Sequence, residues 1–118
     1  MVPMIEELEA RQMMALPQFG GWWQGTFWHA TDSGTFEMNL RQKKRVVTGQ
    51  IVDDDGNRIK LSGKILANNQ LRLNMGTKRV SGVMLARVRL FTLSGSYWGS
   101  DGTRGSFTAN YDFVSSHL

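Results

Sequence analysis

The sequence predicts an all-β protein, an antiparallel up-and-down barrel of seven or eight strands that follows a short N-terminal helix. From Trp22 onward, hydrophobic and polar residues alternate as they do in strands that bury one face. Turn signals recur about every ten residues, so the connections are short and consecutive strands should pair antiparallel. Closing such a meander into a barrel removes its two exposed edges.

Length and composition predict one soluble domain over residues 1–118. We expect a helix over 3–16, the barrel over 20–113 and a tail over 114–118. The sequence contains no cysteine, which excludes disulfides and thiolate metal sites. The N-terminus is acidic where a signal peptide would be basic, and no apolar run is long enough for a membrane span. We therefore expect a cytoplasmic protein.

The helix over 3–16 is predicted from its ends and its charges. Pro3 suits the first helical position, three glutamates follow in the first turns, and Pro17 ends the helix. Ile5, Leu8 and Leu16 fall near one face. This face could close one end of the barrel, which we favour, or form a methionine-rich contact with another subunit.

Most strand boundaries follow from tight turns at Asp55-Gly56, Asn68-Asn69 and Asp101-Gly102. The segment Val83–Trp98 is harder to divide because it is too long for one ordinary strand and has no internal turn signal. Ser94-Gly95-Ser96 suits a bend at a barrel corner. For this reason the predicted number of strands is seven or eight. Leu61-Ser62-Gly63 and Leu93-Ser94-Gly95 are similar pieces that we expect at equivalent barrel positions.

The stretch Phe19–His29 contains three of the four tryptophans and is predicted to be the first strand. Its start, Phe19-Gly20-Gly21-Trp22-Trp23, resembles the F-x-G-x-W motif of lipocalins, and the meander over 19–113 is similar to calycin barrels in general. These are the lipocalins, fatty-acid-binding proteins and avidins. The resemblance implies an interior pocket, and a Trp23 that stacks on Arg104 across the base of the barrel. The chain lacks the cysteines and C-terminal helix common in lipocalins and the biotin-binding pattern of avidins, so no particular ligand is implied.

A ligand at the barrel mouth would meet aromatic side chains, because pockets usually combine apolar walls with a few polar groups. The predicted ligand-binding residues are Trp28, His29, Tyr97, Trp98 and Tyr111. A small barrel can also be filled by its own side chains, here residues such as Phe36, Met38, Phe107 and Phe113. The sequence leaves the ligand pocket and the filled core as alternatives.

No pattern in the sequence favours catalysis, a metal or a cofactor. His117 falls in the tail, which leaves His29 as the one candidate general base, and a partly exposed histidine at a strand end is the better interpretation. Asp53, Asp55 and Asn57 have calcium-loop spacing, but the rest of that pattern fails and an acidic hairpin explains them. No phosphate-binding or dinucleotide-binding glycine pattern occurs.

These observations predict a non-enzymatic binding protein whose barrel holds an apolar or aromatic small molecule, and which forms a homo-oligomer. The first alternative is a structural or protein-interaction module with a filled barrel. A weaker one is single-stranded nucleic-acid binding, which fits the net charge of +4 and would lose affinity steeply in salt. In that case the phosphate contacts would come from Arg41, Lys43, Lys44, Arg45, Arg87 and Arg89.

Overall fold

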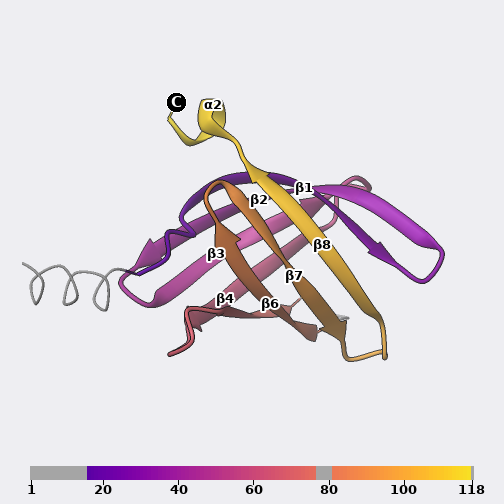
Figure 1. Ribbon diagram of the computed structural model, residues 1–118. Coiled ribbons are helices and arrows are strands. Elements are labelled where there is room, and N and C mark those ends of the chain that lie inside the picture. The colour runs from indigo at the N-terminus through magenta and orange to yellow at the C-terminus, as the bar shows by residue number, and fades with distance from the viewer. Residues whose placement is uncertain (1–15, 77–80, 118) are drawn as a thin grey trace, which may run out of the picture.

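The computed structural model describes residues 16–76 and 81–117, which form a closed barrel of eight antiparallel strands. Each strand pairs with the next along the chain, and β1 pairs with β8 to close the barrel (Figure 1). The predicted all-β meander barrel is therefore confirmed. The strands are β1 (Gly21–His29), β2 (Asp32–Lys43), β3 (Val46–Asp53), β4 (Arg58–Ile65), β5 (Leu71–Gly76), β6 (Ser81–Arg89), β7 (Thr92–Gly99) and β8 (Arg104–Tyr111).

The segment Val83–Trp98, whose division the sequence left open, belongs to two strands, β6 and β7, joined by a hairpin at Leu90 and Phe91. This settles the number of strands at eight. After β8 the chain forms a short helix, α2 (Phe113–Ser116), where a strand end and a tail were predicted. Asp112 caps this helix by accepting a hydrogen bond from the Ser115 N–H at 3.0 Å. The predicted helix over 3–16 lies outside the described residues, except for Leu16, which is in no helix.

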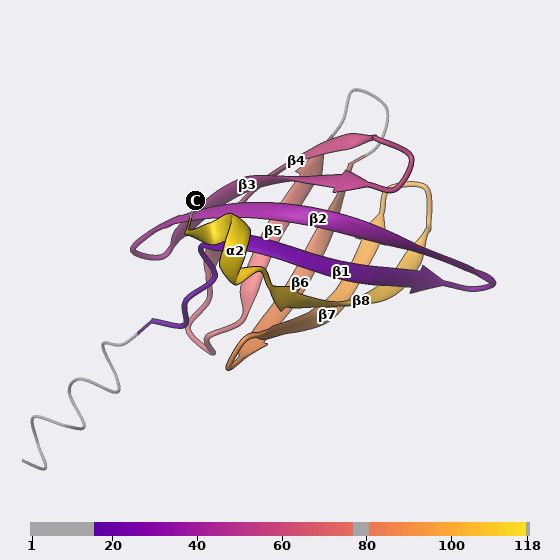
Figure 2. The ribbon, with the colours of Figure 1, turned by 90° about the horizontal axis from the view of Figure 1, so that it is seen from above.

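The two ends of the barrel differ. The start of β1, the β2–β3, β4–β5 and β6–β7 connections and α2 lie at the end we call the closed end (left in Figure 2). The β1–β2, β3–β4 and β7–β8 connections lie at the opposite, open end. No helix of residues 16–76 and 81–117 is long and apolar enough to cross a bilayer.

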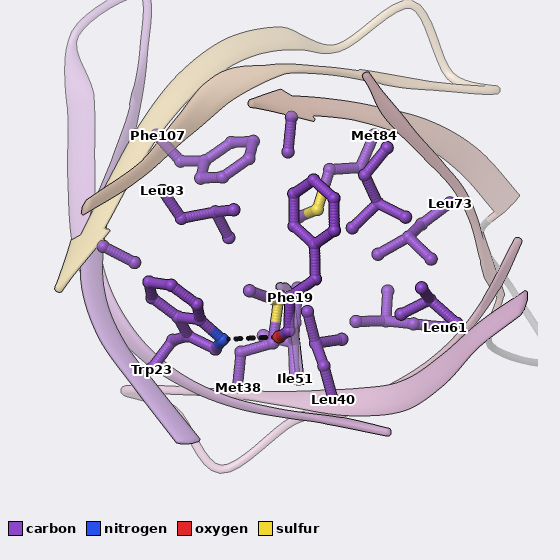
Figure 3. Packing of buried hydrophobic residues seen from close by; sticks show 14 of the residues in the cluster. Phe19, Trp23, Met38, Leu40, Ile51, Leu61, Leu73, Met84, Leu93 and Phe107 are labelled. Atoms are coloured by element: carbon purple, nitrogen blue, oxygen red, sulfur yellow. Dashed lines mark hydrogen bonds between the residues drawn. The ribbon is translucent and has the colours of Figure 1, made fainter. Parts of the chain in front are cut away.

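Phe19 plugs the closed end. Its side chain is fully buried and points into the middle of the barrel, among core residues from most of the strands (Figure 3). The Phe19 carbonyl accepts a hydrogen bond from Trp23 Nε1 at 2.9 Å, and the Phe19 N–H donates to Gln42 Oε1 at 2.7 Å. Gln42 Nε2 also donates to the Pro17 carbonyl at 3.0 Å. The segment before β1 is thus fastened into the barrel by both backbone and side-chain contacts.

The expected contact between Trp23 and Arg104 is absent, and this prediction was wrong. Trp23 is buried at the closed end, but its ring meets the edge of Tyr111 with centroids 5.3 Å apart. Arg104 begins β8 at the open end, opposite Trp98, and is exposed. Because Tyr111 pairs with Trp23 in the sheet, the full length of β8 separates Arg104 from that tryptophan.

Several glycines stand where adjacent strands approach too closely for a side chain. A Cβ on Gly63 would collide with the Arg72 carbonyl, and one on Gly95 would collide with the Leu85 carbonyl. Gly63 and Gly95 thus share a close approach to the neighbouring strand, but β4 runs toward the closed end and β7 toward the open end, so the two similar pieces do not occupy equivalent positions. Such close approach lets the strands curve tightly enough to close a narrow barrel.

Candidate functional site

A pocket of about 290 Å³ occupies the open half of the barrel, above the packed core. This volume lies near the lower end of the usual range for small-molecule sites, about 300–1,000 Å³. The walls are mainly apolar, and six polar side chains stand among them, close to the strand ends. The lining residues are Phe27, His29, Phe36, Ile51, Asp53, Ile59, Met75, Ser81, Gly82, Met84, Tyr97, Gly99, Asp101, Thr103 and Phe107.

Three aromatic rings form one wall of this pocket. The Tyr97 hydroxyl lies 3.0 Å from His29 Nδ1, within hydrogen-bond distance. The ring of Phe27 is nearly parallel to that of His29, at 6.4 Å and 6°, and meets Tyr97 edge-on at 6.5 Å. Gly105 leaves room for Tyr97, because a Cβ there would collide with the tyrosine ring. The wall therefore offers flat apolar surface with a polar group at its edge.

Burial raises the pKa of Tyr97 above its ordinary value of 10.0, so the phenol remains protonated at neutral pH. A protonated phenol and an imidazole each combine a donor with an acceptor in the neutral form. The tautomer of His29 decides which of the two donates in their shared hydrogen bond. A ligand that entered the pocket could exchange hydrogen bonds with either group.

Two aspartates stand at the rim of the pocket. Hydrogen bonds from the Thr103 side chain and then from its backbone N–H, at 3.0 Å, lower the pKa of Asp101 below its ordinary value of 3.8. Asp53 shapes the β3–β4 hairpin instead, accepting from the backbone N–H groups of Asp55 at 3.0 Å and Asn57 at 2.8 Å. Asp53 thus stabilises the tight hairpin that was predicted at Asp55-Gly56.

The five residues predicted to bind a ligand do not gather at one place. His29 and Tyr97 line the pocket. Trp28 and Trp98 point outward, 45% and 37% exposed, because neighbouring residues of a strand face opposite sides. Tyr111 packs on Trp23 at the closed end. Of the five predicted ligand-binding residues, only His29 and Tyr97 are therefore placed to contact a ligand in the pocket.

Several lining residues were not predicted from the sequence to line a pocket, most notably Met84, Asp101 and Thr103. Met84 alternates with Ala86 on the inner face of β6, a signal that was hidden in the undivided segment Val83–Trp98. Asp101 and Thr103 belong to a hairpin that the sequence revealed only as a turn.

The basic residues considered for nucleic-acid binding lie away from the pocket. Arg41 is exposed on β2, Lys43 ends that strand, and Lys44 and Arg45 form the β2–β3 hairpin. Arg87 and Arg89 are exposed near the end of β6. The last five lie toward the closed end, and none of the six lines the pocket.

No protein-family model matches the sequence, and no curated protein matches it. Solved structures with a similar fold include three designed or redesigned β-barrels. A de novo designed fluorescence-activating β-barrel is 15% identical with a TM-score of 0.63, covering 80% of this chain and 94% of its own. A redesigned β-barrel, mFAP1, bound to DFHBI, is 15% identical with a TM-score of 0.61, and the match covers 86% of this chain and 97% of mFAP1. Another redesigned β-barrel is 14% identical with a TM-score of 0.64, and the match covers 87% of this chain and 95% of the redesigned barrel. At these identities the likeness concerns the fold alone.

Proposed function

We propose that this protein binds a small apolar or aromatic molecule in the pocket at the open end of its barrel, without a catalytic step. The observation that carries the proposal is the pocket itself, an apolar cavity of about 290 Å³ with the pair His29 and Tyr97 in one wall. Flat apolar walls favour aromatic ligands, and the polar pair can fix one hydrogen-bonding group of the ligand.

The structural neighbours support the proposal in general terms. A barrel of similar architecture, mFAP1, was solved bound to DFHBI, a small aromatic dye. An eight-stranded barrel is thus wide enough to hold an aromatic molecule when side chains leave part of its interior open. In this chain the closed half is filled by Phe19 and its neighbours, and the open half contains the pocket.

The calycin-like architecture, the homo-oligomer and the cytoplasmic location expected from the sequence are part of the same proposal. The buried Trp23 at the barrel base supports the resemblance to calycins. A homo-oligomer and a cytoplasmic location remain predictions. The second candidate function, a protein-interaction module, is favoured by one observation, the cluster of exposed hydrophobic side chains at the closed end.

Native mass spectrometry of the purified protein tests the proposal. We expect a mass above a whole multiple of the chain mass, with the excess lost on denaturation, and the multiple gives the number of subunits. In Tyr97→Phe, which keeps the ring but loses the hydroxyl, the fraction carrying the ligand should fall several-fold, as expected for one lost hydrogen bond. A clean multiple for the unmodified chain would favour the interaction module instead.

A further inference from the structure

The closed end of the barrel carries most of the exposed hydrophobic surface of the described residues. The described residues include seven exposed large hydrophobic side chains, and five of the seven lie at the closed end. Leu90 at the tip of the β6–β7 hairpin is 86% exposed, and Val114 in α2 is 72% exposed. The other three are Val46, Phe91 and Phe113.

Part of this surface is joined into one cluster, because Phe113 of α2 packs against Phe91 of the β6–β7 hairpin, whereas Val46 belongs to the separate β2–β3 hairpin. The rings of Phe91 and Phe113 meet edge to face with centroids 4.7 Å apart, and Phe113 contacts Tyr111 at 4.8 Å. The Tyr111 N–H donates to the Phe91 carbonyl at 2.9 Å. Leu90 directly precedes Phe91 and Val114 directly follows Phe113 in the chain, and both side chains are largely exposed. A contiguous exposed cluster of this kind usually marks an interaction surface.

The hairpin tip itself is an unusual place for leucine. Leu90 has a φ of +57°, a conformation that glycine and asparagine adopt at far lower cost. Folding alone would favour one of those residues at this exposed turn. A leucine there is neither buried nor suited to the backbone, so its hydrophobic side chain points to a role outside the fold.

Basic residues share this end of the barrel. Arg89 directly precedes Leu90, and Arg87 is fixed by donating to the Asn68 carbonyl at 3.3 Å. Arg45 donates to the Ile65 carbonyl, also at 3.3 Å, and Lys43 and Lys44 stand exposed beside it. Asp112 is the one acidic side chain that the described residues place at this end. The surface therefore combines exposed aliphatic groups with an excess of positive charge.

We propose that the closed end docks on an anionic phospholipid bilayer, with Leu90, Phe91 and Val114 inserted at the interface and the surrounding lysines and arginines facing lipid phosphates. Interfacial binding gains strength from buried apolar area and from attraction to anionic lipids together. Docking in this orientation turns the open end of the barrel (right in Figure 2) toward the aqueous phase. The pocket at that end then faces the aqueous phase as well.

Other occupants fit this surface less well. Single-stranded nucleic acid needs open flat rings for its bases, whereas Leu90 and Val114 are aliphatic and the rings of Phe91 and Phe113 pack on each other. A second copy joined through this end by a two-fold axis would place like charges face to face. Residues 1–15 contain Glu6, Glu7 and Glu9, so this acidic segment is the remaining candidate to cover the basic surface.

Vesicle co-sedimentation of the full chain tests the proposal, with vesicles of phosphatidylcholine alone or with about a third phosphatidylserine. We expect binding to the anionic vesicles that weakens as salt is raised. The double variant Leu90→Asn, Val114→Ser should lower binding at least tenfold, because two inserted side chains are lost. The variant Lys43→Gln, Arg89→Gln should lower it by about fivefold for each charge.

Matched controls lie at the open end. The exposed pair Arg58→Gln, Arg104→Gln removes the same charge, and Trp28→Thr removes an exposed hydrophobic side chain; neither should alter vesicle binding. Urea unfolding shows whether each variant is folded. The double variant Lys43→Gln, Arg89→Gln still tests the surface if the variant at Leu90 proves unstable. Equal binding by closed-end variants and controls would overturn the proposal.

Three further results would also overturn it. The first is a dimer in light scattering that dissociates in Leu90→Asn, Val114→Ser while anionic vesicles remain unbound. The second is salt-sensitive binding to single-stranded DNA with none to vesicles. The third is a marked loss of stability in that same double variant with unchanged vesicle binding, the result expected if residues 1–15 cover the surface.

Discussion

The hydrogen bond between Tyr97 and His29 joins β7 to β1 across the inner side of β8. It forms because both residues face inward near the open end, and because Gly105 on β8 leaves space for the tyrosine ring. At the scale of single residues, the pocket wall thus depends on three positions in three different strands. Each contributes something different: a hydroxyl, an imidazole and the absence of a side chain.

Asp101 is expected to make the free energy of unfolding depend on pH in the acidic range. Its folded pKa lies below the ordinary value of 3.8, so its contribution is complete above that pH and is lost as pH falls through the folded pKa. Asp101→Asn should therefore be less stable than the unmodified chain at pH 7, and the two should converge near pH 2. Urea unfolding at both pH values measures this. A difference that persists undiminished at low pH would contradict the assignment.

At the scale of strands, glycines set how closely neighbours can approach. Gly95→Ala should destabilise the barrel by about 1–3 kcal/mol, because the new methyl group meets the Leu85 carbonyl and the backbone must shift. Gly76→Ala is the matched control, since a Cβ there meets nothing within 4 Å. Urea denaturation gives both free energies of unfolding. Equal effects of the two substitutions would show that close approach does not limit this barrel.

The β6–β7 hairpin should be a place where stability can be gained. Leu90→Asn relieves a left-handed backbone that costs an ordinary residue roughly 1–2 kcal/mol, and it sacrifices little burial because the side chain is 86% exposed. We expect a gain of about 1 kcal/mol in thermal or urea unfolding. Val46→Asn, at an exposed position without positive φ, should give no such gain. A loss of stability in Leu90→Asn would mean that the leucine packs usefully in the fold.

The turns explain which elements the sequence could predict. Gly56 at φ +84°, Asn69 at +66° and Gly102 at +88° have the backbone conformation that their residue types favour. These three connections were predicted correctly, whereas a turn expected at Asp32-Ser33-Gly34 was wrong, because these residues begin β2 and the turn lies at Ala30 and Thr31. Leu90 adopts a similar φ without any local sequence signal, so the β6–β7 hairpin was missed. Where residue type and backbone disagree, tertiary pairing decides the structure.

The candidate site was predictable only in part, for a geometric reason. His29 and Tyr97 are inward-facing residues at the open end, as expected from their strands. The same alternation that places them inside turns Trp28 and Trp98 outward. Tyr111 also faces inward, but β8 runs toward the closed end and carries it away from the pocket. The residue types suggested a binding site. Which of these residues line the pocket depends on whether each side chain faces inward and on the end of the barrel toward which its strand runs.

At the scale of the whole molecule, the barrel separates two surfaces along its axis. The open end holds an apolar pocket with Asp53 and Asp101 at its rim. The closed end is plugged by Phe19 and carries exposed hydrophobic and basic side chains outside. The packed core between them fixes their relative orientation. Changes at one end are therefore expected to leave binding at the other unaffected, since distant sites usually behave additively.

NMR with a panel of small aromatic compounds that includes DFHBI shows whether the open half of the barrel is a small-molecule site. We expect shifts of amide signals around the pocket, at Met84, Tyr97 and Thr103. Met75→Trp, which fills the pocket, should abolish them, whereas Asn74→Trp adds the same bulk to the outer face of β5 and should not. A panel that shifts no pocket signal, or shifts that survive in Met75→Trp, would contradict the proposed small-molecule site.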